Sequence, residues 1–210
     1  DKAARAEPSN PEIYLIRSNL LRSAHRYDEA RDAIRVARSL DPLSLMYLNQ
    51  EASIEFCADR PDAALKIFEA ERRMNPGSML AVNGTIRSLA LLGRFDEAVA
   101  LWRNAARANG DTAMVRSLTR VRSASDYWAL RRAEGKRALS RLVPDRMPRD
   151  MILARFAAGE EDSAYRTIEL TPASERPSLY RLACYEGADE YRHTARFKAV
   201  IDRIGYLKGH

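Results

Sequence analysis

Residues 27–30 read Tyr-Asp-Glu-Ala, and residues 93–98 read Gly-Arg-Phe-Asp-Glu-Ala. Ala30 and Ala98 lie two steps of 34 residues apart, and Ala64 occupies the step between them. Several further columns keep the same period without a gap, which indicates an internal repeat. These columns hold an acidic residue (Asp28, Asp62, Asp96), a bulky residue (Ile34, Phe68, Trp102), a ring (Tyr27, Pro61, Phe95) and a helix breaker (Pro42, Pro76, Gly110).

The period divides the first half of the chain into repeated units. Three full units span residues 11–44, 45–78 and 79–112. Pro8 lies one period before Pro42. We therefore interpret residues 1–10 as the end of a preceding repeat, and the chain as a piece of a longer array.

Each unit has the pattern of two helices joined by a short turn. Apolar residues recur at spacings of three and four, which is typical of a helix face. In the first unit we expect the turn at His25-Arg26. The second helix opens with Asp28 and Glu29, whose charge suits the positive end of its dipole, and Pro42 ends it.

The repeated alanines predict where the two helices of a hairpin approach most closely. Small side chains at Ala30, Ala64 and Ala98 permit a tight crossing, and the bulky residue four positions later fills the space beside it. A single hairpin cannot bury both of its faces, so neighbouring hairpins must stack. Glu71 breaks the pattern of small residues in the second helix, and we expect it to be exposed or loosely packed.

The 34-residue helix-turn-helix unit resembles the tetratricopeptide repeat (TPR). The resemblance rests on an alanine, a bulky residue four positions later and then a proline. The resemblance covers residues 1–112 and departs from the family pattern at Ile86 and Glu71. It implies an all-α fold, a right-handed α-solenoid of TPR-type hairpins with a C-terminal helical cap.

The strict register stops after Thr112, although helical patterns continue. We expect a degenerate helical hairpin over residues 113–143, a degenerate TPR-like hairpin over 147–170, and capping helices over 176–210. The tail is also similar to the closing segment of TPR regions in bacterial regulators with a winged-helix DNA-binding domain and in class III adenylate cyclases. The residues that carry this similarity are Tyr191-Arg192, Arg196-Phe197, Ile201, Ile204 and Gly205.

The composition is that of a globular protein. The chain has 210 residues, of which 46% are hydrophobic and 30% charged. No apolar run approaches the roughly 18 residues that span a bilayer, so we expect no membrane contact. Cys57 and Cys184 are too few for a disulfide framework, and we expect buried thiols in a reducing, cytoplasmic setting.

The sequence gives little support for catalysis. His25, His193 and His210 have no nucleophile or carboxylate beside them in a recognised motif. The chain contains no glycine-rich phosphate loop and no metalloprotease motif. We therefore predict a protein that is not an enzyme, with no catalytic residues, no metal and no cofactor.

By the family resemblance, the first helices of the repeats line a concave groove. Asparagine side chains can pair with peptide amides, and arginine can hold a carboxylate in bidentate fashion. Apolar contacts for a ligand would come from Met46, Phe56 and Leu80. Carboxylate-clamp TPR domains have a lysine at the position of Leu15, which this chain lacks. The alternative is that these are solvated polar positions. The predicted groove residues are Asn19, Arg22, Asn49, Ser53, Phe56, Asn83 and Arg87.

Residues 113–150 carry the whole charge excess of the chain. They contain ten basic and four acidic residues, and the formal net charge of the chain is +6. A helix would group Arg132 with Lys136, and Arg137 with Arg141, into basic stripes. This surface would suit an acidic partner, or nucleic acid next to a DNA-binding domain, and the alternative is an ordinary solvated face.

Two functions remain open from the sequence. The first is a non-enzymatic TPR scaffold that binds a peptide or a partner domain in its groove. The alternative is the sensory, regulatory C-terminal domain of a bacterial transcriptional regulator, which binds a small ligand or self-associates to control a DNA-binding domain. Nucleic acid would then be contacted only through a domain missing from this chain.

Overall fold

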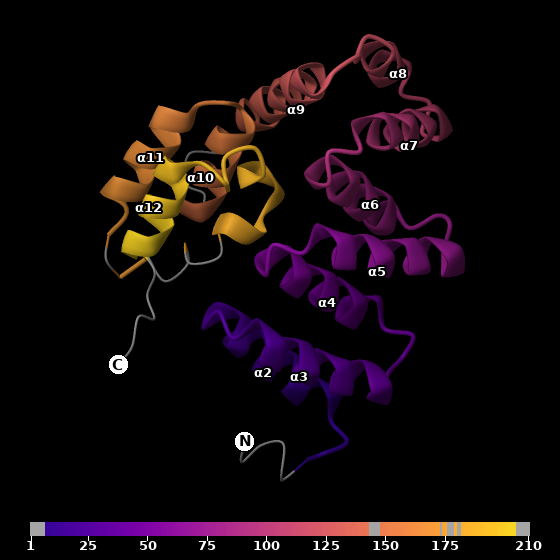
Figure 1. Ribbon diagram of the computed structural model, residues 1–210, viewed down its shortest axis with the longest axis vertical. Coiled ribbons are helices and arrows are strands. Elements are labelled where there is room, and N and C mark those ends of the chain that lie inside the picture. The colour runs from indigo at the N-terminus through magenta and orange to yellow at the C-terminus, as the bar shows by residue number, and fades with distance from the viewer. Residues whose placement is uncertain (1–6, 143–147, 173, 176–178, 180–181, 205–210) are drawn as a thin grey trace. The chain divides into compact units, whose positions relative to one another are not determined.

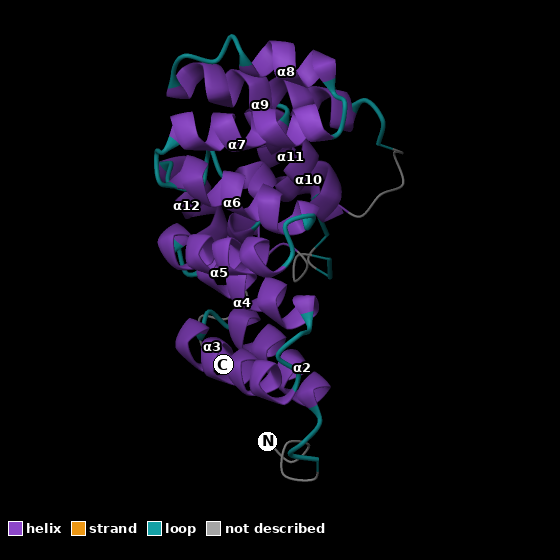
Figure 2. Cartoon of the chain, turned by 90° about the vertical axis from the view of Figure 1, so that its right-hand side faces the viewer, coloured by secondary structure: helices purple, strands orange, loops and turns teal. Residues whose placement is uncertain are grey.

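The computed structural model describes residues 7–142, 148–172, 174–175, 179 and 182–204. All regular secondary structure within these ranges is helical, as Figure 2 shows, so the predicted all-α class is confirmed there. The other residues of the predicted segments, including Gly205 and His210, lie outside the described part of the chain.

The chain forms two compact units, Asp1–Leu92 and Gly93–His210. The first contains α2 (Pro11–Ser23), α3 (Tyr27–Leu40), α4 (Leu45–Cys57), α5 (Pro61–Met74) and α6 (Met79–Leu91). The second contains α7 (Phe95–Ala108), α8 (Thr112–Leu118), α9 (Ala124–Leu139), α10 (Pro148–Ala157), α11 (Glu161–Leu170), η2 (Leu182–Cys184), η3 (Glu186–Ala188) and α12 (Ala195–Ile204). The border between the units falls inside the predicted 79–112 repeat.

The 34-residue period reappears in the helix boundaries. The first helices α2, α4 and α6 begin at Pro11, Leu45 and Met79, and the second helices α3, α5 and α7 end at Leu40, Met74 and Ala108. The helices α3 and α5 each stop two residues before a proline, because the residue that precedes proline is pushed out of the helical conformation.

The turn between the two helices also repeats. His25, Asp59 and Gly93 lie one period apart, and all three have a left-handed backbone, with φ of 56°, 58° and 73°. The turn predicted at His25-Arg26 is therefore present. The tyrosine hydroxyl of Tyr27 lies 2.9 Å from Nδ1 of His25, which fixes the imidazole over the turn.

In the first unit each helix packs on the next one along the chain, from α2 to α6 (Figure 1). Ala30 and Ala64 are fully buried there, as the crossing argument predicts, and so is Ala98 in the second unit. Ala64 belongs to a cluster with Phe56 and Phe68. The ring of Phe68 covers Gly84 so closely that an added Cβ would lie 2.4 Å from it.

Glu71 is buried rather than exposed, which corrects the prediction of loose packing at this position. Its carboxylate Oε1 accepts a hydrogen bond of 2.5 Å from the hydroxyl of Ser78. The same hydroxyl caps α6 by accepting a bond from the backbone N–H of Ala81 at 3.2 Å. The carboxylate is thus enclosed because it anchors the residue at which the next helix starts.

The second unit is less regular than the first. Within the predicted hairpin over 113–143, the first helix, α8, ends at Leu118, and Ser123 caps α9 by accepting a hydrogen bond of 3.1 Å from the N–H of Asp126. The predicted cap over 176–210 contains one α-helix, α12, and two 3-10 turns among its described residues. These pack on α10 and α11 around Phe156, which is fully buried.

Candidate functional site

The candidate site of the first unit lies on its first helices, α2, α4 and α6. The amide oxygen of Asn10 starts α2 by accepting a 3.0 Å hydrogen bond from the N–H of Glu12, and Ser78 starts α6. Because α4 and α6 begin one period and two periods after α2, equivalent side chains return to the same face. We call the predicted groove residues and Met46, Gln50 and Leu80 the first-helix face.

A polar network joins α2 to α4 on this face. The guanidinium of Arg22 donates one hydrogen bond to the hydroxyl of Ser53 and another, of 2.8 Å, to the amide oxygen of Asn19. Nε2 of Gln50 donates to the same amide oxygen at 2.9 Å. Arg22 is buried, so its first role is to hold two helices in register and not to project toward a ligand.

Arg87 and Phe56 form the second part of the face. The guanidinium carbon of Arg87 lies 4.0 Å from the centroid of the Phe56 ring, a cation–π contact that joins α6 to α4. Phe56 is only 3% exposed. Phe56 is therefore buried beneath Arg87, which corrects the prediction that its ring is an accessible apolar contact for a ligand.

The exposed part of the face is a short row that repeats once. Met46 and Leu80 are 51% and 47% exposed, and each is followed three residues later by an asparagine, Asn49 or Asn83. Asn83 is exposed and Asn49 half-buried. Within the described residues, no donor reaches the buried amide oxygen of Asn49. The row presents an apolar side chain beside an amide on two adjacent first helices.

The sequence analysis missed Gln50, which completes the polar network. The signal was available, since Gln50 stands four residues after Met46 and three before Ser53 on one helix. It also missed the ion pairs of Arg31, of which the pair with Glu55 of α4 is buried and the pair with Asp28 is exposed on the aspartate side. Arg31 contacts Glu55 at 2.7 Å and Asp28 at 2.6 Å.

The Arg31–Glu55 pair joins α3 to α4, whereas Arg31 and Asp28 both lie on α3. The hydrogen bond that Arg31 donates to Glu55 is the main cause that raises the pKa of Arg31 above its usual value, and the bond to Asp28 adds to it. Arg38 forms a similar pair with Glu51. Glu51 and Glu55 lie four residues apart, and both are buried, so they stabilise the packing of one hairpin on the next.

The four predicted basic-surface residues lie on or just after α9. Arg132 is partly buried and pairs with Glu190, while Arg137 pairs with Glu134 on its own helix. Lys136 and Arg141 are exposed. The structure thus leaves Lys136, Arg137 and Arg141 on the surface and places Arg132 in the wall of a cavity.

The cysteines and histidines complete the inventory of reactive side chains. Cys57 and Cys184 are buried, but neither is a free thiol, so the prediction of free thiols is wrong. The argument for a reducing, cytoplasmic setting that rested on them no longer holds.

The histidines form no metal site of their own in the described residues. His25 lies in a turn and His193 on the surface. Within the described ranges, no three side chains of His, Cys, Asp or Glu form a group that could hold a metal ion.

None of the described helices is long and apolar enough to cross a membrane. A comparison with protein-family models found no match for this chain. Searches of curated proteins and of solved structures found no match either.

Proposed function

We propose that this chain is a non-enzymatic interaction module, an α-solenoid of TPR-type hairpins that binds a peptide on its first-helix face. The observation that carries this proposal is the repeated row, in which the exposed Met46 stands beside the half-buried Asn49 and the exposed Leu80 beside the exposed Asn83. A peptide offers an apolar side chain and a backbone amide at every residue, and this row offers a partner for both.

The row stands on a rigid base. The helix α2 is held against α4 by the hydrogen bonds among Arg22, Asn19, Gln50 and Ser53. The helix α6 is held against α4 by the cation–π contact of Arg87 with Phe56. Little conformational entropy is then lost on these helices when a ligand binds, which favours affinity. Binding would not require the buried Arg22 to leave its partners.

The spacing of the row defines the ligand. Packed helices lie about 8–10 Å apart, and a peptide in the polyproline II conformation rises about 3.1 Å per residue with three residues per turn. Apolar side chains that contact both Met46 and Leu80 would therefore stand about three residues apart in a polyproline II peptide, with amides between them that pair with Asn49 and Asn83.

The test begins with peptides selected from a random display library on the purified chain. We expect Asn49→Ala combined with Asn83→Ala to weaken a selected peptide at least tenfold, since each lost hydrogen bond contributes about 1 kcal/mol. The dissociation constant is measured by calorimetry.

The matched control is Lys66→Ala combined with Arg73→Ala, two exposed positions on the second helix α5. We expect this variant to bind as the wild type does. Equal affinity of the wild type and the asparagine variant would contradict the proposal, provided that both variants melt at the wild-type temperature.

A further inference from the structure

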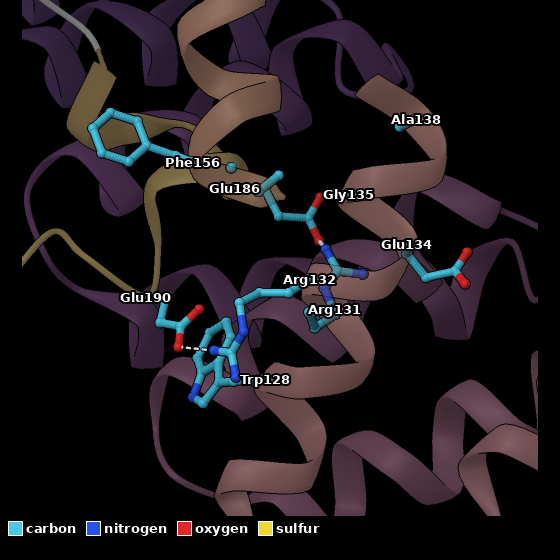
Figure 3. Close-up of a pocket in the computed structure, with 11 residues that line it drawn as sticks. Trp128, Arg131, Arg132, Glu134, Gly135, Ala138, Phe156, Glu186 and Glu190 are labelled. Atoms are coloured by element: carbon cyan, nitrogen blue, oxygen red, sulfur yellow. Dashed lines mark hydrogen bonds and ion pairs between the residues drawn. The ribbon is translucent and has the colours of Figure 1, made fainter. Parts of the chain in front are cut away.

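The second unit contains a cavity of about 330 Å³ that the proposed peptide site does not use. It lies between α9, α10 and the turn around η3 (Figure 3). This volume is at the small end of the range of about 300–1,000 Å³ that is typical of ligand sites. Its principal lining side chains are Trp128, Arg131, Arg132, Phe156, Glu186 and Glu190.

Two ion pairs cross the cavity wall. Arg131 pairs with Glu186, and Arg132 pairs with Glu190, so that α9 is joined to the segment around η3 (Figure 3). All four side chains are partly exposed, from 27% for Glu190 to 48% for Glu186. The remaining lining carboxylate, Glu134, pairs with Arg137. The wall therefore carries charges of both signs in balance.

The two arginines have supports other than their glutamates. The guanidinium of Arg131 lies 5.2 Å from the centroid of the Trp102 ring. The side chain of Arg132 passes over Gly159, where an added Cβ would lie 2.7 Å from its Cδ. Each arginine would thus keep its place if its glutamate turned toward another partner.

The wall itself is closely packed. An added Cβ on Gly135 would lie 2.1 Å from the backbone oxygen of Ala157, and one on Gly187 would lie 2.5 Å from that of Leu153. The backbones of α9 and of η3 therefore lie directly on α10. A cavity between elements held this way has a defined shape before a ligand enters.

We propose that this cavity binds a small zwitterion of the α-amino acid class. Its carboxylate pairs with Arg131 or Arg132, its ammonium group pairs with the glutamate that the carboxylate displaces, and its side chain lies against Trp128 and Phe156. A ligand with one charge would free a glutamate or an arginine and leave it without a partner, which is costly in a partly buried site. A zwitterion replaces one arginine–glutamate pair with two pairs, one from its carboxylate to the arginine and one from its ammonium group to the glutamate, so that every charge keeps a partner.

The test uses the full chain, in which the two tryptophans are Trp128 in the cavity lining and Trp102 against Arg131, so that tryptophan fluorescence reports on the site. The common L-amino acids are titrated one at a time, and melting is followed in parallel. We expect at least one of them to change the fluorescence and raise the melting temperature. Its amide and its N-acetyl derivative, each with one charge removed, should bind at least tenfold more weakly.

Two phenylalanine variants on α9 locate the site. Ala138 lines the cavity and is exposed, so Ala138→Phe fills the mouth and should abolish binding. Ala129 is also exposed and lies outside the lining, so Ala129→Phe should leave binding unchanged. The proposal is overturned if no amino acid binds, if the amide binds as well as the zwitterion, or if Ala138→Phe retains binding. None of these outcomes bears on the peptide face of the first unit.

Discussion

In the first unit, α3 is joined to α4 by buried ion pairs, whereas in the second unit α9 lies against α10 with a glycine backbone at the contact. Charged side chains of both signs fill the junction of α3 with α4. At the junction of α9 with α10, Gly135 has no side chain, and the two backbones come close together. The difference teaches that one hairpin can be joined to the next either by paired charges or by a close approach of the two backbones. Substitutions at the two junctions and at the left-handed turns test this comparison.

The largest effect is expected from breaking a buried pair of the first unit. Arg31→Met leaves the carboxylate of Glu55 buried, with Arg60 still 3.6 Å away. We expect a loss of about 3 kcal/mol in the free energy of unfolding, measured with denaturant. The double variant Arg31→Met and Glu55→Leu should recover most of this loss, because no buried charge is then unpaired.

The matched control in the second unit is an exposed pair. Arg203 lies 3.8 Å from Glu169, and both side chains are 63% exposed. We expect Arg203→Met to change the unfolding free energy by less than about 1 kcal/mol. If the two single variants lose the same stability, burial does not distinguish the ion pairs of the two units.

The second substitution, Gly135→Ala, tests the glycine junction. In an unobstructed helix interior this change would stabilise by about 0.5–1 kcal/mol. Here the new Cβ would meet the backbone oxygen of Ala157, which cannot rotate away, so we expect a net loss of about 2 kcal/mol. Gly77→Ala, where the nearest atom is 3.7 Å away, serves as the control and should be close to neutral. A gain in stability for Gly135→Ala would refute the contact.

The smallest effect concerns the left-handed turn that recurs through the chain. Gly93 has φ of 73° and open space around it, so Gly93→Ala should cost about 1 kcal/mol from backbone strain alone. Gly159 has φ of 78° and also faces Arg132, so Gly159→Ala should cost more and should disturb the cavity. Thermal melting of both variants checks the order, and a neutral Gly93→Ala would show that the turn relaxes.

The sequence predicted the helical hairpins of the first compact unit because every 34-residue repeat must bury the same apolar helix faces. Alanines at Ala30 and Ala64, and prolines after the second helices, mark crossings and ends that repeat every 34 residues. A local pattern of this kind is visible in the chain before it folds.

The errors have a common cause, which is that local spacing does not identify a distant partner. Glu71 looked like a break in an apolar pattern, but its buried Oε1 accepts a hydrogen bond from Ser78. Phe56 looked like an accessible apolar contact until Arg87 covered it. Arg132 belonged to a basic stripe by spacing, yet its carboxylate partner, Glu190, lies 58 residues further on.

The account rests on alanines that mark the tightest helix crossings, and two adjacent alanines of α5 allow a direct measurement. Ala64 is fully buried in the crossing, whereas Ala63 is only partly buried. Ala64→Leu and Ala63→Leu have identical compositions, and their melting temperatures are compared. We predict that Ala64→Leu overpacks the crossing, costs about 1–3 kcal/mol and lowers the melting temperature by about 2–10 °C, while Ala63→Leu stays close to the wild type. Equal melting temperatures for the two variants would contradict the account.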